Sequence, residues 1–161
     1  MRIGIFGGSF SPVHEGHLAL AKEVLSELNL DQVIFVPSHE PPLKKKEELW
    51  PVTRRVGLLK ETLKNFPLFS VSDCEMERKG KSFTVDTLLY FRKKFGKKTI
   101  LYFLSGADTL QTLPRWKSVK RIFKLCRFVV MSRPGFTLQK SNPWPILTLP
   151  FEALPVSSTV L

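Results

Sequence analysis

Cysteine is scarce in this chain of 161 residues, which contains only Cys74 and Cys126. Neither belongs to a C-x-x-C pair, so nothing indicates a disulfide framework or a cysteine-based zinc site. Long apolar runs are also missing, because no stretch approaches the roughly 18 consecutive apolar residues that a bilayer span requires. The N-terminal apolar run, residues 3–6, is too short for the core of a signal peptide. We therefore expect a cytoplasmic protein with reduced thiols and no membrane partner.

Acidic residues are the minority among the charges. The chain has 25 Lys and Arg against 14 Asp and Glu, a formal net charge of +11. This excess predicts an anionic partner, which charge alone leaves open between nucleic acid, a membrane surface and a phosphorylated small molecule. Hydrophobic residues make up 43% of the chain and include 13 Phe, which argues against disorder. The length suits one domain, so we expect residues 1–161 to form a single domain.

Short apolar runs alternate with segments of helical periodicity along the chain. Strands are predicted at residues 2–6, 32–36, 68–72, 99–104, 127–131 and 146–149. Helices are predicted at residues 16–29, 52–64, 82–95 (with Ser82 as the cap) and 116–124. Residues 38–50 and 132–145 are expected to be surface loops. Such alternation is typical of an α/β fold: a single doubly wound, mostly parallel sheet with helices on both faces.

The turn after the first strand lacks both common glycine-rich fingerprints of nucleotide-binding proteins. A G-x-G-x-x-G match would need glycine at Phe6 or at Phe10. The triplet at residues 80–82 resembles the end of a P-loop, but the glycine required five positions earlier is Glu75. A Rossmann dehydrogenase is therefore disfavoured, and the P-loop match is discarded.

What this turn does contain is an H-x-G-H pattern. His14 and His17 are two of the chain's three histidines, and they stand where the first helix is expected to begin. Imidazoles there can donate hydrogen bonds to phosphate oxygens, and Gly16 lets a phosphate approach the backbone. The competing interpretation, a pair of structural histidines that cap a turn, stays open. We expect no protein-held metal, because no acidic or Cys ligand lies at helical spacing.

Five segments, in order along nearly the whole chain, resemble one family. Residues 7–17, GGSFSPVHEGH, are similar to the signature of the H-x-G-H nucleotidyltransferases, which release pyrophosphate from a nucleoside triphosphate. The other four segments are KGKSFTVDTL (79–88), GAD (106–108) followed by Trp116, SRPG (132–135) and VSST (156–159). Together they resemble bacterial nicotinate-nucleotide adenylyltransferases, which join nicotinate mononucleotide to the adenylyl group of ATP in NAD biosynthesis. The resemblance implies a Rossmann-like nucleotidyltransferase fold, these two substrates as partners, Mg²⁺ carried with ATP, and no nucleic acid.

The resemblance also implies roles for particular residues. We expect His17 to donate to the α-phosphate in the transition state, with His14 beside it holding the triphosphate. Nicotinate contacts are expected near Thr84, at a helix N-terminus, and from Trp116 stacked on the pyridine ring. The alternatives are an ordinary cap for Thr84 and a core residue for Trp116. The other predicted substrate-binding residues surround the nucleotide and its phosphates: Gly7, Gly8, Ser9 and Phe10 around the nucleotide, and Gly16, Lys44 and Arg55 at phosphates. Asp108 is expected to accept from a ribose hydroxyl, with a structural cap as the alternative, and Arg133, Ser157, Ser158 and Thr159 are expected on the adenylyl side. Asp86 and Gly106 complete the predicted set.

Two departures from the family pattern affect this set. Ser11 stands where the family has Asp or Asn, so a weaker hydroxyl replaces a turn-stabilising carboxylate or amide. The chain also stops at Leu161, where relatives continue into a helix with a phosphate-binding arginine. The sequence leaves open whether this end is natural, and Arg133 or a neighbouring lysine is the candidate to compensate.

Two other functions remain as alternatives. Phosphopantetheine adenylyltransferase shares H-x-G-H and a C-terminal Ser-Ser-Thr or Ser-Ser-Ser segment, but the segments at 82–88 and 106–116 argue against it. A basic nucleic-acid-binding module would explain the charge of +11. Such a module needs basic residues clustered with exposed aromatics, whereas the lysines are dispersed and most Phe fall on apolar stripes. Nucleic acid is therefore the less favoured partner.

Overall fold

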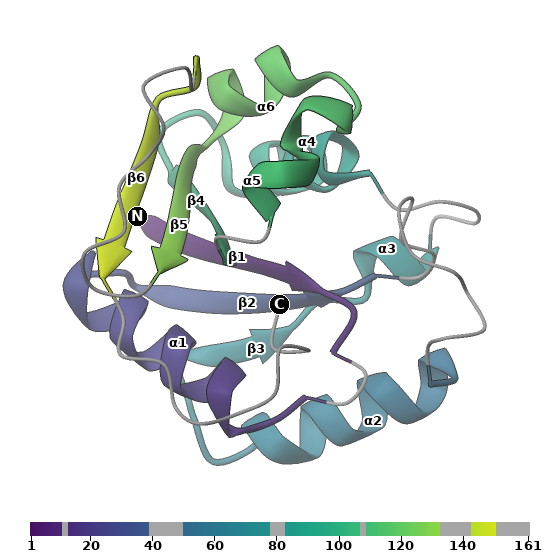
Figure 1. Ribbon diagram of the computed structural model, residues 1–161. Coiled ribbons are helices and arrows are strands. Elements are labelled where there is room, and N and C mark those ends of the chain that lie inside the picture. Colours follow the sequence, from purple (N-terminus) through teal and green to yellow (C-terminus); the bar gives the residue numbers. More distant parts are fainter. Residues whose placement is uncertain (11–12, 39–49, 78–82, 107–108, 133–142, 151–161) are drawn as a thin grey trace.

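One six-stranded, all-parallel sheet organises the computed structural model, which describes residues 1–10, 13–38, 50–77, 83–106, 109–132 and 143–150. The strand order is β3-β2-β1-β4-β5-β6 (Figure 1). The strands are β1 (Arg2–Gly8), β2 (Gln32–Pro37), β3 (Phe69–Val71), β4 (Ile100–Gly106), β5 (Arg127–Ser132) and β6 (Ile146–Pro150). The central strands are buried along nearly their whole length, which explains why they read as continuous apolar runs.

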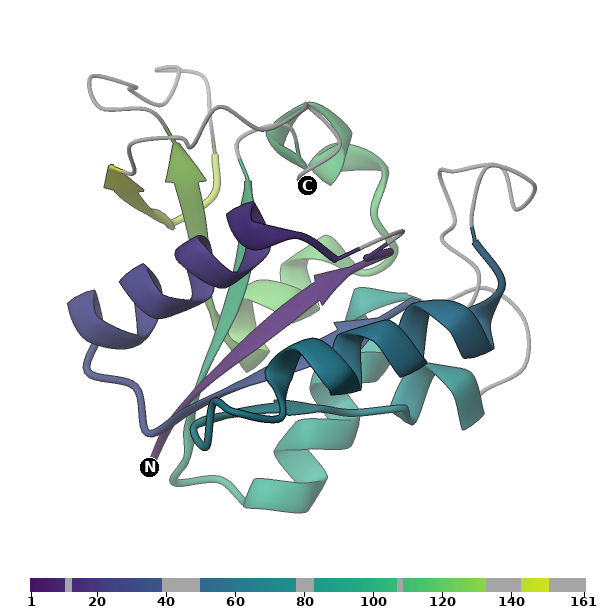
Figure 2. The ribbon, with the colours of Figure 1, turned by 90° about the horizontal axis from the view of Figure 1, so that it is seen from below.

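Helices cover both faces of the sheet. Figure 2 shows α1 (Glu15–Glu27) and α2 (Val52–Leu63) on the near side. The other helices pack into the second core, on the opposite face: α3 (Cys74–Glu77), α4 (Thr84–Phe95), α5 (Thr109–Thr112), a 3₁₀ turn (Leu113–Arg115) and α6 (Val119–Leu125). The predicted doubly wound α/β fold is confirmed.

Two hydrophobic cores result from the alternation of side chains along the strands. Phe6 on β1 pairs with Phe35 on β2, and both belong to the core beneath α1 and α2. The preceding pair, Ile5 and Ile34, belongs to the core beneath α4 and α6. Burying each such side chain contributes roughly 1.5–3 kcal/mol. Two filled cores therefore hold the central strands in a fixed register.

The order of the strands reverses between β1 and β4. From β1 the chain runs outward through β2 and β3, and it then returns to β4 on the other side of β1. The β1–β4 pairing ends at Phe6 and Leu104, although β1 continues to Gly8 and β4 to Gly106. In open α/β sheets, ligands bind outside the carboxyl ends of strands at such a switch point. The fold therefore directs attention to the residues that follow β1 and β4.

Each predicted strand is confirmed in approximate position, but two of the predicted helix starts are wrong. The N-cap of α4 is Phe83, without a side-chain cap bond, so Ser82, outside the described residues, is not its cap. The predicted helix 116–124 begins only at Val119, because Ser118 has a left-handed φ of 55°. Pro114, early in the 3₁₀ turn, separates α5 from that helix. The short helices α3 and α5 were not predicted, because four residues show no helical period.

Most residues of the two predicted loops, 38–50 and 132–145, lie outside the described part of the chain. Within that part, no helix has the length and apolar character needed to cross a bilayer.

Candidate functional site

The H-x-G-H segment forms the N-terminus of α1. His14 is the N-cap residue, and its Nδ1 accepts a hydrogen bond from the Gly16 amide at 3.1 Å. His17, three residues later, accepts from the His14 amide through its own Nδ1 at 3.0 Å. The two rings stack with their centroids 4.0 Å apart. This reciprocal capping box confirms that the histidines cap the helix, and it occupies Nδ1 of both rings.

The capping bonds define the tautomer of both rings. Because each Nδ1 accepts from an N–H group, the proton of a neutral ring belongs on Nε2. Nε2 of His14 is buried and has no hydrogen-bond partner among the described residues. A buried donor without an acceptor is costly, and an anionic ligand would supply the acceptor. His14 therefore presents a donor without a described acceptor at the helix N-terminus, where the helix dipole favours negative charge.

Burial lowers the pKa of His14 below its ordinary value of 6.5. Protonation would also place a hydrogen on the Nδ1 that accepts from the Gly16 amide. Between the folded-state pKa and 6.5 the unfolded chain binds more protons, so stability contributed by neutral His14 is lost as pH falls through that window. We expect the melting temperature to fall between about pH 7.5 and about pH 5.5, and to fall less in His14→Ser, whose cap does not titrate. Calorimetry at both pH values measures the difference, and identical pH dependence in the two proteins would contradict it.

The backbone after β1 is held close to His17 by Phe10. Phe10 has a φ of 45°, a left-handed conformation that is strained for an aromatic residue. Its ring is 2% exposed and packs edge-to-face against His17, with the centroids 5.0 Å apart. Phe10 also packs on Phe6 and Phe35. The turn backbone and the His17 ring are thus fixed as one unit.

Close packing accounts for the two glycines at the end of β1. A Cβ at Gly7 would lie 3.1 Å from the ring of Phe103, and one at Gly8 would lie 3.3 Å from the ring of Phe10. Both distances are shorter than ordinary van der Waals contact, so neither position readily accepts a side chain. Gly7 and Gly8 therefore leave main chain without side chains at two of the positions where phosphate contacts are predicted.

Arg55 enters the same region from α2. Its side chain is 1% exposed, and burial lowers its pKa. Nε donates to the carbonyl oxygen of Trp50 at 2.9 Å, and Nη1 donates to those of Ser9 at 2.9 Å and Ser38 at 2.7 Å. No carboxylate among the described residues forms an ion pair with it. The predicted phosphate contact of Arg55 stays a prediction, and the guanidinium lies beside the turn that follows β1.

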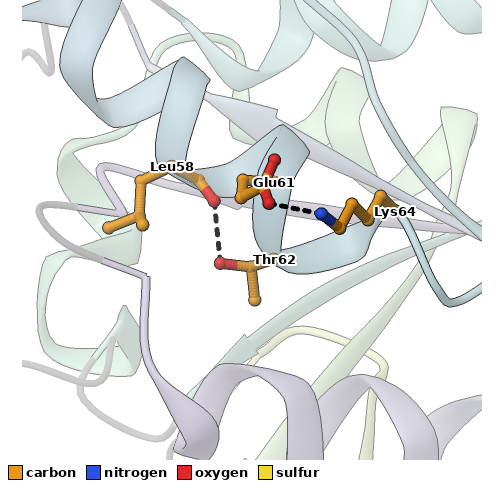
Figure 3. Close-up of polar contacts among 4 residues, drawn as sticks. All are labelled: Leu58, Glu61, Thr62 and Lys64. Atoms are coloured by element: carbon orange, nitrogen blue, oxygen red, sulfur yellow. Dashed lines mark hydrogen bonds and ion pairs between the residues drawn. The ribbon is translucent and has the colours of Figure 1, made fainter.

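The other polar contacts on α2 are of a different kind. At its C-terminal end, Lys64 forms a 2.5 Å ion pair with Glu61, and Thr62 donates to the Leu58 carbonyl at 2.7 Å (Figure 3). All these groups are exposed, and exposed ion pairs contribute at most about 1 kcal/mol. These contacts stabilise the helix locally and do not belong to the site.

The residues predicted to recognise nicotinate belong to elements on the opposite face of the sheet from α1 and α2. Trp116 is partly buried, packs edge-to-face on Phe103 at 6.0 Å, and donates from Nε1 to Thr112 Oγ1 at 3.1 Å. Nζ of the next residue, Lys117, lies 4.8 Å from the ring centroid of Phe83, the N-cap of α4. The Trp116 segment and the α4 N-terminus, where Thr84 is the first residue, are therefore neighbours. Phe103 also faces Gly7, which links this pair to the turn after β1.

The remaining predicted site residues divide into two groups. Gly106 ends β4, Gly16 is buried in the first turn of α1, and Asp86 lies in the first turn of α4. Those outside the described residues are Lys44, Asp108, Arg133, Ser157, Ser158 and Thr159, and Ser11, the departure from the family pattern, also lies outside them.

Two polar features of this region were not predicted. Ser38 directly follows β2, and its buried Oγ has no partner among the described residues. Its position just past a strand's carboxyl end was the available signal. Thr87 donates to the buried Glu75 Oε2 at 2.5 Å, which joins α3 to α4 near Thr84. No sequence pattern indicated that pair. Among the described residues no three His, Cys, Asp or Glu side chains cluster as a metal site.

Comparisons with known proteins identify the family of the chain. A family model described as cytidylyltransferase-like matches residues 5–161. A probable nicotinate-nucleotide adenylyltransferase of Clostridium novyi is 44% identical over 136 residues, covering 84% of this chain and 68% of the relative. The nicotinate-nucleotide adenylyltransferase of Bacillus subtilis is 38% identical over 160 residues, covering 99% of this chain and 83% of the relative.

Solved structures show the same fold. Nicotinic acid mononucleotide adenylyltransferase of Plasmodium falciparum, complexed with NaAD, superposes with a TM-score of 0.75 at 21% identity, covering 99% of this chain and 78% of the other. The same enzyme complexed with APC gives 0.71 at 19% identity, covering 99% and 77%. At such identity the superposition shows the fold alone, and the sequence relatives decide the family. The chain therefore belongs to the cytidylyltransferase-like family and, within it, to the nicotinate-nucleotide adenylyltransferases.

Proposed function

We propose that this protein transfers the adenylyl group of ATP to nicotinate mononucleotide, giving deamido-NAD and pyrophosphate. The observation that carries the proposal is the capping box at the switch point of the sheet, which leaves the buried Nε2 of His14 without an acceptor among the residues that the structure describes. A triphosphate oxygen is the acceptor that this donor suits. The identity of 38–44% to nicotinate-nucleotide adenylyltransferases supports the choice of acceptor substrate.

The reaction needs positioning and charge stabilisation more than proton transfer. A phosphate monoester is largely ionised at neutral pH, so its oxygen can attack without a general base. That oxygen forms a bond to the α-phosphorus of ATP, and the bond from the α-phosphorus to the bridging oxygen breaks in line, releasing pyrophosphate. His17 donates to the α-phosphate as negative charge develops, while His14 and the main-chain amides of residues 7–10 hold the triphosphate.

Mg²⁺ enters this scheme as part of the ATP substrate. The described site offers imidazoles and backbone amides, and among the described residues no group of three potential ligands gathers there. Mg²⁺ on nucleotides is commonly held by phosphate oxygens and water, with few protein ligands. The ion would neutralise charge on the triphosphate, and the chain's own groups would orient it.

Nicotinate recognition is assigned to the α4 N-terminus and Trp116. Amides at the start of α4 favour a carboxylate, and the indole supplies a stacking surface. We expect Trp116→Leu to raise KM for nicotinate mononucleotide roughly two- to tenfold, the equivalent of about 0.5–1.5 kcal/mol of aromatic contact, while KM for ATP stays unchanged. Initial rates with each substrate varied in turn measure this. Trp144→Leu is the control, because that indole stacks on Phe123 beside β6. A rise in KM for ATP alone would remove Trp116 from nicotinate recognition.

A steady-state assay of pyrophosphate release tests the proposed function. ATP and Mg²⁺ are supplied with nicotinate mononucleotide, nicotinamide mononucleotide or phosphopantetheine in turn. We expect the highest kcat/KM with nicotinate mononucleotide. Turnover with phosphopantetheine alone would contradict the assignment, and so would salt-sensitive binding of RNA or DNA without any turnover of ATP.

A further inference from the structure

We propose that Arg55 is a positioning residue: its buried guanidinium holds the backbone at Ser9 against the segment after β2 and so fixes the turn that carries the phosphate-binding amides. The inference deepens the proposed function and rests on it for the role of the turn. It differs from the phosphate contact that the resemblance implies for Arg55, because here the guanidinium acts through the protein's own backbone.

The guanidinium joins three separate segments of the chain. Three of its five N–H groups donate to backbone carbonyls: Ser9 follows β1, Ser38 follows β2, and Trp50 precedes α2. A fourth link, from the Ser38 amide to the Gly8 carbonyl at 2.9 Å, ties the same two strand ends together. The Arg55 side chain is 1% exposed, and no carboxylate among the described residues pairs with it. Of the described groups, these carbonyls are therefore the ones that compensate the burial of its charge.

Regular pairing cannot hold Ser9, because the β1–β2 ladder ends at Gly8 and Pro37. The next residue, Phe10, has the strained φ of 45°, so the turn needs contacts that impose this conformation. The buried ring of Phe10 supplies one anchor and the Arg55 bond to the Ser9 carbonyl supplies another. The two anchors act on adjacent residues of the same turn.

Peptide geometry connects Arg55 to the amide that would meet a phosphate. The Ser9 carbonyl and the Phe10 N–H belong to one planar trans peptide, in which they point in opposite directions. Fixing the carbonyl toward Arg55 therefore aims the Phe10 amide away from Arg55. The Phe10 ring packs on His17, with the ring centroids 5.0 Å apart. The Arg55 bond to the Ser9 carbonyl therefore also supports the His17 imidazole through Phe10. A lysine cannot reproduce this, because its single ammonium lacks the planar fork that reaches carbonyls on different segments.

Arg54 provides a matched control. It has the same charge, lies one position earlier on α2, is exposed, and stacks over the Trp50 ring at 3.9 Å. Arg54→Met removes one positive charge from the same helix, as Arg55→Met does, but it leaves the bonds to Ser9 and Ser38 in place. Differences between variants at the two positions thus report the hydrogen bonds of Arg55 to the three carbonyls, which we call the Arg55 clamp, and not the net charge.

The test compares Arg55→Lys and Arg55→Met with Arg54→Lys and Arg54→Met. Thermal unfolding establishes that each variant is folded, steady-state kinetics separate kcat from KM, and NMR of the substrate-free proteins reports the imidazole resonances of His14 and His17. We expect Arg55→Lys to lower kcat by about 10²-fold, the cost of a misplacement near 1 Å, and to shift the His17 resonances. The Arg54 variants should match the unsubstituted protein in both measurements.

Three results would overturn the proposal. Unchanged kcat and His17 resonances in a folded Arg55→Lys protein would reduce Arg55 to a structural contact. A raised KM for ATP with unchanged substrate-free resonances would make it a direct phosphate ligand. Fast solvent exchange of the Arg55 Nε proton in the unsubstituted protein, at the rate of Arg54, would show that the clamp does not form, and this measurement needs no variant. Absence of adenylyl transfer would refute the proposed function, while the resonances would still decide whether Arg55 positions the turn.

Discussion

We expect His17→Asn to lower kcat by about 10²- to 10³-fold, the usual effect of removing one donor that stabilises charge in the transition state. Asparagine places a carbonyl oxygen near the position of the imidazole Nδ1, so it can still accept from the His14 amide. It lacks the Nε2 donor that the capping geometry assigns to His17. The substitution thus removes the proposed chemistry and keeps the helix cap, and a pyrophosphate-release assay at saturating substrates measures the loss.

His17→Ala is the companion variant that removes both functions. It loses the bond to the His14 amide as well, so its free energy of unfolding should lie about 0.5–2 kcal/mol below that of His17→Asn, which keeps that bond. Urea titration separates the two. If His17→Asn turns over at a near-normal rate, His17 acts only as a helix cap and the proposed mechanism loses its main donor.

The second large effect is expected at Phe10. Phe10→Ala should cost about 3–5 kcal/mol of unfolding free energy, because it empties a site that is 2% exposed between Phe6, Phe35 and His17. Alanine keeps the strain of the positive φ without the ring that opposes it. We also expect kcat to fall by at least about tenfold, because the turn amides and His17 lose their shared support. Unfolding and initial-rate measurements follow the two losses separately.

Phe69→Ala is the matched control for this second effect. Phe69 is also buried, at 7% exposed, and belongs to the same core, but its ring contacts are with Phe35 and Phe66. Its substitution should cost comparable stability and leave kcat unchanged at temperatures where both variants are folded. Equal losses of kcat in the two variants would show that general destabilisation, and not the contact with His17, lowers the rate.

Much of the fold follows from local sequence pattern. The runs at residues 2–6 and 99–104 are apolar on both faces, which requires strands covered on two sides, and the structure places them side by side at the sheet centre. Helical periodicity located α1 and α2 well, because each presents a single apolar stripe to one core. It failed before Val119, where Ser118 adopts a left-handed conformation that serine rarely takes.

The site was less predictable because its geometry depends on contacts between distant residues. The H-x-G-H spacing indicated histidines at a helix start but left capping and phosphate binding as alternatives. The structure shows that Nδ1 of each ring caps the helix, and the proposed phosphate contacts are therefore assigned to Nε2. The positive φ of Phe10 and the three carbonyls around Arg55 depend on how β1, β2 and α2 pack, and no local pattern encodes them.

A crystal structure of this chain with the dinucleotide product tests the central claim most directly. The account predicts that the product's phosphates lie within hydrogen-bond distance, about 2.7–3.2 Å, of Nε2 of His14 or His17 and of the main-chain amides that follow β1. The nicotinate ring should then lie beside Trp116 and the start of α4. A product bound elsewhere, with both imidazole Nε2 atoms out of its reach, would contradict the account.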